Sequence, residues 1–208
     1  MKKPFTLVEV LIAMSVLSVF LLGLMQFYSS TENVLSSGIE KTEMFERARI
    51  AMDMMANDLT CVYYSQTDKD LTPLQCADSS FSVATVRPEK LNKEAKTNIV
   101  AVKYNWNSGK QTLVYSSDAN GDNFGVNDAS YGNETELVEG VTDFKVKSYA
   151  EGDYLPAIVV IRMEMVDSKT LRRIKANPSG KSAILKNANK REFRRMVVID
   201  RGQPKPNL

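Results

Sequence analysis

Four oxygen-bearing side chains lie close together between residues 118 and 128, where they could bind a metal ion. Asp118, Asn120 and Asp122 occupy alternate positions, and Asp128 follows. Oxygen ligands at alternate positions can converge on one hard cation such as calcium. However, the central glycine and the final bidentate acid of a calcium loop are both missing from their positions. Two interpretations stay open: a polar surface loop, or a calcium site; we expect no other cofactor.

The two cysteines, Cys61 and Cys76, offer a second kind of chemistry. In an oxidising compartment they could form a disulfide that closes a short loop, which would stabilise the fold by about 3 kcal/mol if it were unstrained. Two buried free thiols are the alternative.

Enzyme chemistry has little support. The chain of 208 residues contains no histidine, so it lacks the commonest general base, histidine-containing triads and histidine-bound metals. A carboxylate pair or a serine–lysine pair remains chemically conceivable, but no pattern marks either one. We therefore expect a protein that is not an enzyme.

Glu9 is the acid whose surroundings most need an explanation, because an uncharged, largely apolar run follows it to Tyr28. Residues 5–28 would form a helix roughly 36 Å long, which is enough to cross a hydrocarbon core of about 30 Å. A carboxylate costs about 2.5 to 3.5 kcal/mol at the centre of such a helix and less near an interface. Glu9 therefore requires a partner or a function.

The charges beside this run predict how it is oriented. Lys2 and Lys3 precede it and the next basic residue is Lys41, so the N-terminus should stay cytoplasmic and the rest should be exported. A cleaved signal peptide is the competing interpretation. The run is longer than a signal-peptide core and no A-x-A cleavage pattern follows it, which favours a single-pass anchor.

The stretch Phe5-Thr6-Leu7-Val8-Glu9 resembles the processing signal of type IV prepilins and type II secretion pseudopilins. In that family a membrane peptidase cuts before the phenylalanine and methylates the new amine, and the glutamate pairs with the terminal ammonium of a neighbouring subunit. The resemblance implies a leader at 1–4, cleavage between Pro4 and Phe5, methylation of Phe5, and assembly through Glu9. Pro4 departs from the usual glycine, and its fixed φ and missing N–H change how the peptide meets a protease. A plain anchor with an accidental Glu9 is the alternative.

The helix should continue beyond the membrane, over residues 29–60. Phe45, Ala48, Met52, Met55 and Leu59 follow a 3-4-3-4 spacing, which predicts one apolar stripe lying on a folded domain. The charged residues of this segment, including Asp53 and Asp58, should form its solvated face. Ser36, Ser37 and Gly38 mark the expected site of a bend or break.

Residues 61–200 should form a β-rich periplasmic domain without helices between its strands. The expected strands are rich in β-branched and aromatic residues, and a turn at 107–110 joins two of them in a hairpin. They are residues 81–87, 99–106, 111–116, 136–138, 143–149, 157–166 and 193–200. We predict an α+β, pilin-like fold in which an antiparallel sheet assembly packs on the long helix.

A strongly basic block lies near the C-terminus, although the whole chain carries a net charge of only +2. It contains Lys169, Arg172, Arg173, Lys175, Lys181, Lys186, Lys190, Arg191, Arg194 and Arg195, with Glu192 as the one acid between them. We expect a mobile solvated loop first, a contact for an acidic partner subunit second, and nucleic-acid binding a distant third. Residues 201–208 should be a loose tail.

Looser matches at 51–59, 137–146, 155–157 and 193–198 resemble the J-type minor pseudopilins, and PilW-like minor pilins are close. The resemblance implies a structural part of the complex that initiates or caps a periplasmic pseudopilus. It would sit in the inner membrane and contact other minor and major pseudopilins through N-terminal helices. Its further partners would be prepilin peptidase and membrane lipid. Small residues such as Ala13, Ser15, Ser18 and Gly23 would allow close helix packing. A type IV minor pilin and a stand-alone anchored calcium-binding domain are the alternatives.

Overall fold

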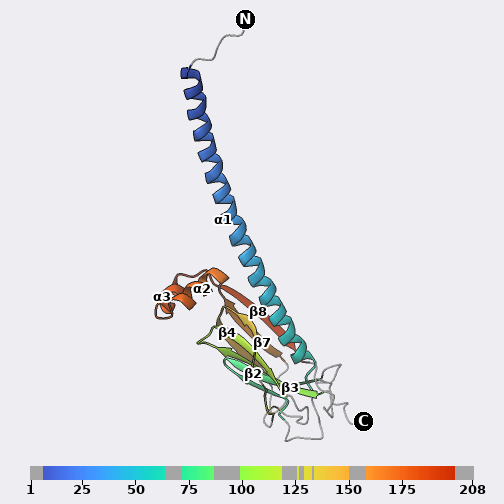
Figure 1. Ribbon diagram of the computed structural model, residues 1–208. Coiled ribbons are helices and arrows are strands. Elements are labelled where there is room, and N and C mark those ends of the chain that lie inside the picture. Colours follow the sequence, from blue (N-terminus) through green and yellow to red (C-terminus); the bar gives the residue numbers. More distant parts are fainter. Residues whose placement is uncertain are drawn as a thin grey trace, which may run out of the picture. The chain divides into compact units, whose positions relative to one another are not determined.

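The computed structural model describes residues 7–63, 72–86, 99–118, 126, 129–132, 134–149 and 158–199. The chain divides into two compact units, residues 1–43 and 44–208. Helix α1 (Leu7–Thr60) contributes to both of them. Figure 1 draws this helix from blue to teal along the sequence. Pro4 and Phe5, the predicted cleavage site, lie outside the described residues.

Of the expected bend or break, the break is wrong, because α1 is continuous through Ser36, Ser37 and Gly38. A β-carbon built on Gly38 would meet nothing within 4 Å, so no close contact explains this glycine. The hydroxyl of Thr42 donates a hydrogen bond to the Gly38 carbonyl at 3.1 Å. This bond satisfies the hydroxyl within the helix and does not interrupt it.

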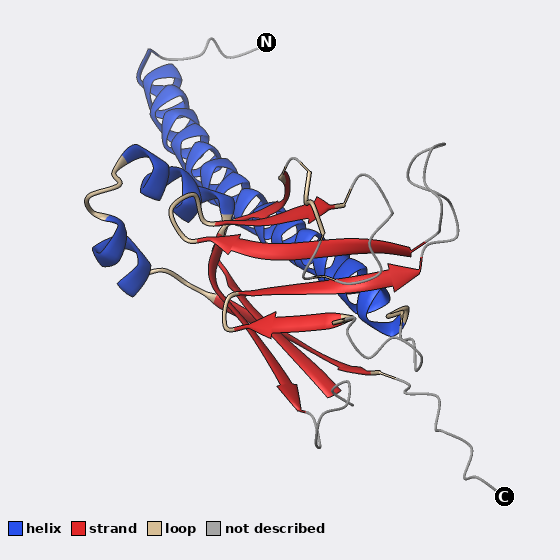
Figure 2. Ribbon diagram, turned by 90° about the horizontal axis from the view of Figure 1, so that it is seen from below, coloured by secondary structure: helices blue, strands red, loops and turns tan. Residues whose placement is uncertain are grey.

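Among its described residues, the second unit contains eight strands in two antiparallel sheets, which Figure 2 shows in red. The larger sheet has the order β1-β2-β3-β4-β5, and the smaller has the order β6-β7-β8. The strands are β1 (Leu74–Ala77), β2 (Ser80–Val86), β3 (Ile99–Asn107), β4 (Thr112–Ser117), β5 (Thr135–Glu139), β6 (Val141–Tyr149), β7 (Ile158–Met165) and β8 (Arg191–Val198). The long helix on antiparallel sheets confirms the coarse α+β layout.

The predicted hairpin turn between β3 and β4 is confirmed. The side-chain oxygen of Asn107 accepts hydrogen bonds from the backbone N–H groups of Gly109 and Lys110, at 3.1 and 3.0 Å. An asparagine that bonds forward to the backbone in this way stabilises a tight turn. Strand β1 was not predicted: it is only four residues long, and a two-residue turn joins it to β2.

The chain crosses from the larger sheet to the smaller one at Gly140, between β5 and β6. The Gly140 φ of +84° suits glycine, and a β-carbon there would lie 2.9 Å from the Val166 carbonyl oxygen. The N–H groups of Gly140 and Val141 both donate to the Gln111 carbonyl at 2.9 Å. This corner fixes one sheet against the other.

One hydrophobic core joins both sheets to the last turns of α1. Met44, Ala48, Met55 and Leu59 from the helix are buried with residues such as Phe81 and Ile161. Most of the predicted stripe is confirmed, but Phe45 is 49% exposed and Met44 takes its place in the core. The ring of Phe45 instead meets the edge of Phe193 on β8, with centroids 5.3 Å apart.

Two short helices between β7 and β8 overturn the expectation of a mobile loop. They are α2 (Ser168–Ala176) and α3 (Lys181–Lys186). Asp167 caps α2 by accepting a hydrogen bond from the Thr170 N–H at 2.7 Å, and Pro178 follows its end. Leu171 and Ile174 are buried on one face, so the basic side chains take the other positions.

Candidate functional site

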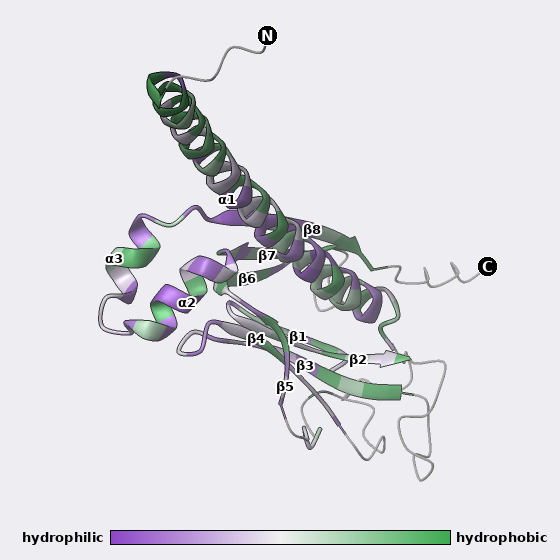
Figure 3. Ribbon diagram, turned by 45° about the horizontal axis from the view of Figure 1, so that its top comes forward, coloured by the Kyte–Doolittle hydropathy of each residue, from purple (hydrophilic) through white to green (hydrophobic). Residues whose placement is uncertain are grey.

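The candidate functional site is the N-terminal part of α1, residues 7–39, whose large apolar side chains are not covered by any other described part of the chain. All of its large apolar residues are exposed, from Leu7 to Ile39. This stretch contains a segment long and apolar enough to cross a membrane, and none of that segment is buried. In Figure 3 these turns of α1 are predominantly green, the colour of hydrophobic residues. Such a helix requires lipid or other apolar helices around it.

The hydroxyl groups in this segment form hydrogen bonds within the helix. Ser15 donates to the Ile12 carbonyl and Ser18 to the Met14 carbonyl, both at 2.8 Å, and Thr31 donates to the Phe27 carbonyl at 2.9 Å. These bonds lower the cost of placing hydroxyl groups in an environment without water. Gly23 has no atom within 4 Å of an added β-carbon, so its surface is open to close approach.

Glu9 lies in the first turn of α1 and is the acid of that turn. The first N–H groups of a helix lack intrahelical acceptors and carry a partial positive charge, which favours a carboxylate there. A cation from another molecule would further stabilise the charge of the Glu9 carboxylate in an apolar environment. The position is therefore suitable for an intermolecular ion pair.

A second acid on the same helix, Asp58, was predicted to be solvated but is buried. Its side chain accepts a hydrogen bond of 2.6 Å from the hydroxyl of Tyr104 on β3, which is also fully buried. Asp58 therefore connects α1 to the larger sheet, and its solvent-facing assignment is corrected.

The predicted calcium ligands cannot be compared as a set. Asn120, Asp122 and Asp128 lie outside the described residues. Asp118 is buried at the end of β4, where its N–H donates to the Ala101 carbonyl at 2.8 Å. Across the residues that the structure describes, no group of three acidic, cysteine or histidine side chains could hold a metal ion.

The predicted disulfide is not formed, because Cys61 and Cys76 are both free. The Val86 N–H donates to the Cys61 carbonyl at 2.9 Å, whereas Cys76 pairs with Phe81, at the other end of β2. Five strand positions separate these points by roughly 16 Å, more than twice what a disulfide spans. Burial raises the pKa of the Cys76 thiol to about 11, and a hydrogen bond with Ser148 partly offsets this effect.

Part of the basic block forms ion pairs inside the domain. Lys175 binds Glu139 at 3.2 Å, Lys190 binds Glu164 at 2.9 Å, and Arg195 binds Asp53 at 2.7 Å. These contacts anchor α2 and β8, so part of the basic block is structural.

The ion pair with Lys190 changes the pKa of the Glu164 carboxyl. Burial by itself would raise its pKa, but hydrogen bonds from Lys190 and Thr142 and the charges of Lys190 and Arg162 outweigh burial and lower that pKa. The charged carboxylate is therefore the form that the folded domain favours.

No model of a known protein family matches the chain, and the search of curated proteins finds no relative.

Proposed function

We propose that this protein is a minor pseudopilin of a type II secretion system, a structural subunit of the complex that initiates or caps a periplasmic pseudopilus. One observation carries the proposal: an exposed, membrane-length apolar helix has a single acid, Glu9, in its first turn and continues into a β-rich domain. This combination suits a subunit whose helix is first held in a membrane and then packs against the helices of other subunits when it leaves the membrane. The folded domain stays outside the membrane throughout.

Glu9 supplies the assembly step in this proposal. Cleavage before Phe5 would create an ammonium group near one end of the apolar segment. An ammonium from a neighbouring subunit would pair with Glu9, and the pair would form only when two helices lie side by side. The carboxylate would thereby select pilin-type neighbours over lipid and fix their axial register.

The β-rich domain supplies specificity outside the membrane. Its core includes the last turns of α1, so one continuous helix carries the apolar segment at one end and packs in the domain at the other. Movement of the helix out of the membrane would carry the domain with it, which is the mechanical task of a subunit that helps to move folded proteins through an outer-membrane channel.

Tandem mass spectrometry of the N-terminal peptide tests the pathway. The protein should be isolated from membranes of cells that contain an active prepilin peptidase, and from matched cells whose peptidase is inactive. We expect N-methylated Phe5 in the first sample and an uncut N-terminus in the second. Retention of Met1 in both samples would contradict the proposal.

A Glu9→Ala variant tests the assembly role separately. It should be cleaved and remain in the membrane but lose co-purification with other pseudopilins. Glu32→Ala provides the matched control, because Glu32 is a second exposed acid on α1. Equal behaviour of the two variants would remove the role assigned to Glu9. Co-purification with pilus subunits instead of secretion components would favour a type IV minor pilin.

A further inference from the structure

Strand β8 forms an open edge of the smaller sheet. Its register with β7 is unbroken, from Ile158 opposite Val198 to Met165 opposite Arg191. Among the described residues, no strand pairs with its other side. The opposite edge strand of this sheet, β6, is tied to the larger sheet through its N–H groups at Val141 and Val146.

The edge at β8 is longer than either edge of the larger sheet. The larger sheet ends in β1 and β5, which are four and five residues long, whereas β8 has eight residues. Proteins usually shorten, bulge or cover an edge strand to prevent pairing with other chains. Strand β8 has no proline or glycine, and no register shift interrupts its pairing with β7.

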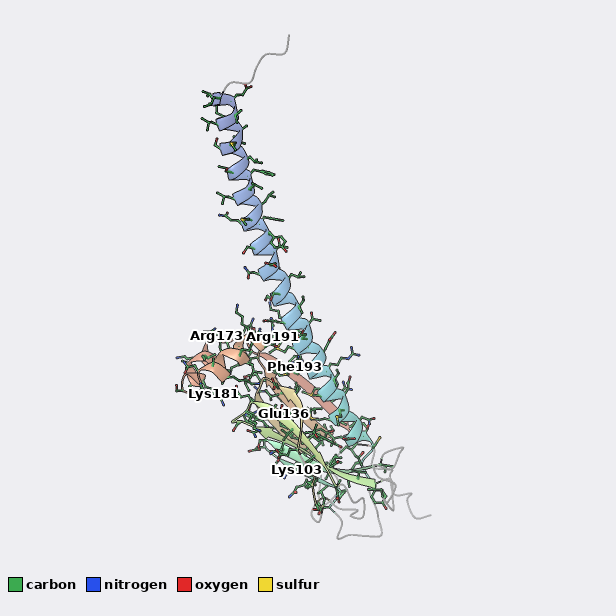
Figure 4. The ribbon with its side chains drawn as sticks, viewed as in Figure 1. Lys103, Glu136, Arg173, Lys181, Arg191 and Phe193 are labelled. Atoms are coloured by element: carbon green, nitrogen blue, oxygen red, sulfur yellow. The ribbon has the colours of Figure 1, made fainter. Side chains whose placement is uncertain are left out.

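The two faces of β8 differ in their surroundings. On one face Phe193 and Val197 pack on the core, and Arg195 reaches Asp53 of α1; Figure 4 labels Phe193 beside α1. On the other face Met196 and Val198 are 64% and 61% exposed. Their partners on β7 are also apolar, Val160 and Ile158, and Tyr149 on β6 lies opposite Ile158. The open edge therefore adjoins an exposed apolar surface.

The charges of β8 restrict what could pair with it. The strand carries Arg191, Arg194 and Arg195 against Glu192, a net charge of +2. Within the described residues, Arg191 and Arg194 take part in no ion pair. Pairing with β8 of a second copy would bring two strands of charge +2 together, which costs energy where like charges lie opposite each other. Charge complementarity favours an acidic strand.

We propose that β8 is a docking edge for an extended segment of a partner protein that is acidic in one half and apolar in the other. The segment would add a fourth strand to the β6-β7-β8 sheet through main-chain hydrogen bonds. Its acids would lie near Arg191 and Arg194, and its apolar side chains would cover Met196 and Val198. This inference goes beyond the proposed function and does not rest on it, since it concerns the domain alone.

Peptide probes on the full chain, held in nanodiscs of zwitterionic lipid, test the proposal. The probes are end-blocked octapeptides with four Val followed by four Glu, four Val followed by four Lys, and the Glu–Val peptide methylated on every backbone nitrogen. Hydrogen exchange of the amides at 191–198 is the readout. The Glu–Val peptide should slow exchange there, in a manner that weakens with salt, and the other two should not.

A charge-reversed double variant, Arg191→Glu with Arg194→Glu, separates docking from damage to the fold. It should bind the Glu–Val peptide at least about tenfold more weakly and should acquire binding of the Lys–Val peptide, because electrostatic complementarity sets partner choice. An unfolded variant could not show this exchange of preference. Lys169→Glu with Lys186→Glu reverses two exposed charges on α2 and α3 and should leave both affinities unchanged.

Three outcomes would overturn the proposal. The first is the absence of any β8 protection by the Glu–Val peptide. The second is equal protection by the N-methylated peptide, which has no backbone N–H group left to donate to β8. The third is an equal effect of the control reversals, which would show attraction to general basic charge rather than to this edge.

Discussion

The two parts of α1 on either side of Met44 meet their surroundings in opposite ways. From Leu7 to Ile39 the large apolar side chains are exposed on every side of the helix. From Met44 to Thr60 one stripe is buried in the core, and the rest of the helix carries charges. An apolar stripe finds its partner within the same domain, whereas a helix that is apolar all round must find it in lipid or in other helices.

The acids of the two parts differ in the same way. Asp58 is buried in the domain and receives a hydrogen bond from Tyr104. Glu9 lies in the first turn of a segment that contributes nothing to the domain core. Substitutions at one acid should therefore change folding, and substitutions at the other should change association.

Truncation of one apolar residue in each part gives the largest predicted contrast. Met55→Ala should reduce the free energy of unfolding of the domain by about 2 to 5 kcal/mol, because Met55 is fully buried. Leu17→Ala should change it by less than about 0.5 kcal/mol, because Leu17 is exposed. Urea unfolding of both variants in detergent, followed by fluorescence of the single tryptophan, Trp106, provides the measurement.

Trp106 is a suitable reporter because its indole N–H donates to the Val141 carbonyl at 3.0 Å and thereby connects the two sheets. A comparable loss in Leu17→Ala would mean that the exposed segment folds together with the domain. The contrast between the two parts of α1 would then fail.

Removal of the hydroxyl that bonds Asp58 should have the next largest effect. Tyr104→Phe should cost the domain about 1 to 3 kcal/mol, since it takes a donor from a buried carboxylate. Tyr28→Phe is the matched control on the exposed part of α1 and should leave the midpoint of Trp106 fluorescence unchanged. Equal midpoints for the two variants would show that the buried bond adds no net stability.

The general architecture could be predicted from the sequence because local patterns determine it. An apolar run of membrane length, a 3-4-3-4 stripe and alternating β-rich segments each have one simple structural solution. Asn107 predicted its turn for the same reason, as its side chain bonds the next residues of its own loop. The pilin family and the role of Glu9 remain proposals, because they depend on other molecules.

The errors arise where distant parts of the chain decide the outcome. Asp58 appeared to be a surface acid because Tyr104, its donor, lies on a strand far along the sequence. Phe45 and Met44 exchanged roles because the phase of the buried stripe depends on where the sheets lie. The helix α2 could have been found, since Asp167 is a good cap, Leu171 and Ile174 are spaced on one face, and Pro178 follows; the high charge concealed this pattern.

The two cysteines allow the end of α1 to be compared with the larger sheet, because Cys61 follows α1 and Cys76 lies on β1. Without reductant, denatured protein should show two free thiols in a colorimetric assay, whereas a disulfide would leave none. In native protein at pH 8, iodoacetamide should modify the exposed Cys61 at least about tenfold faster than Cys76, whose thiolate is scarce because its pKa is raised to about 11. Peptide mass spectrometry over time measures both rates.

The smallest predicted effect concerns Glu164, in the part of the protein that has its own core. The pKa of its carboxyl is lowered in the folded domain, so the unfolded state takes up a proton first as the pH falls. The stability that this carboxylate contributes is therefore fully present above the ordinary pKa of glutamate. It is lost as the pH falls through the folded pKa. Lys190→Met removes a hydrogen bond and a charge that lower this pKa. It should cost less than about 1 kcal/mol at pH 7, because the pair is partly exposed. Urea unfolding at pH 7 and pH 3 should show a smaller cost at pH 3, because the stability that Glu164 contributes is lost as the pH falls toward and through its lowered folded pKa. An equal cost at both pH values would mean that Lys190 acts through packing of its aliphatic chain and not through its charge.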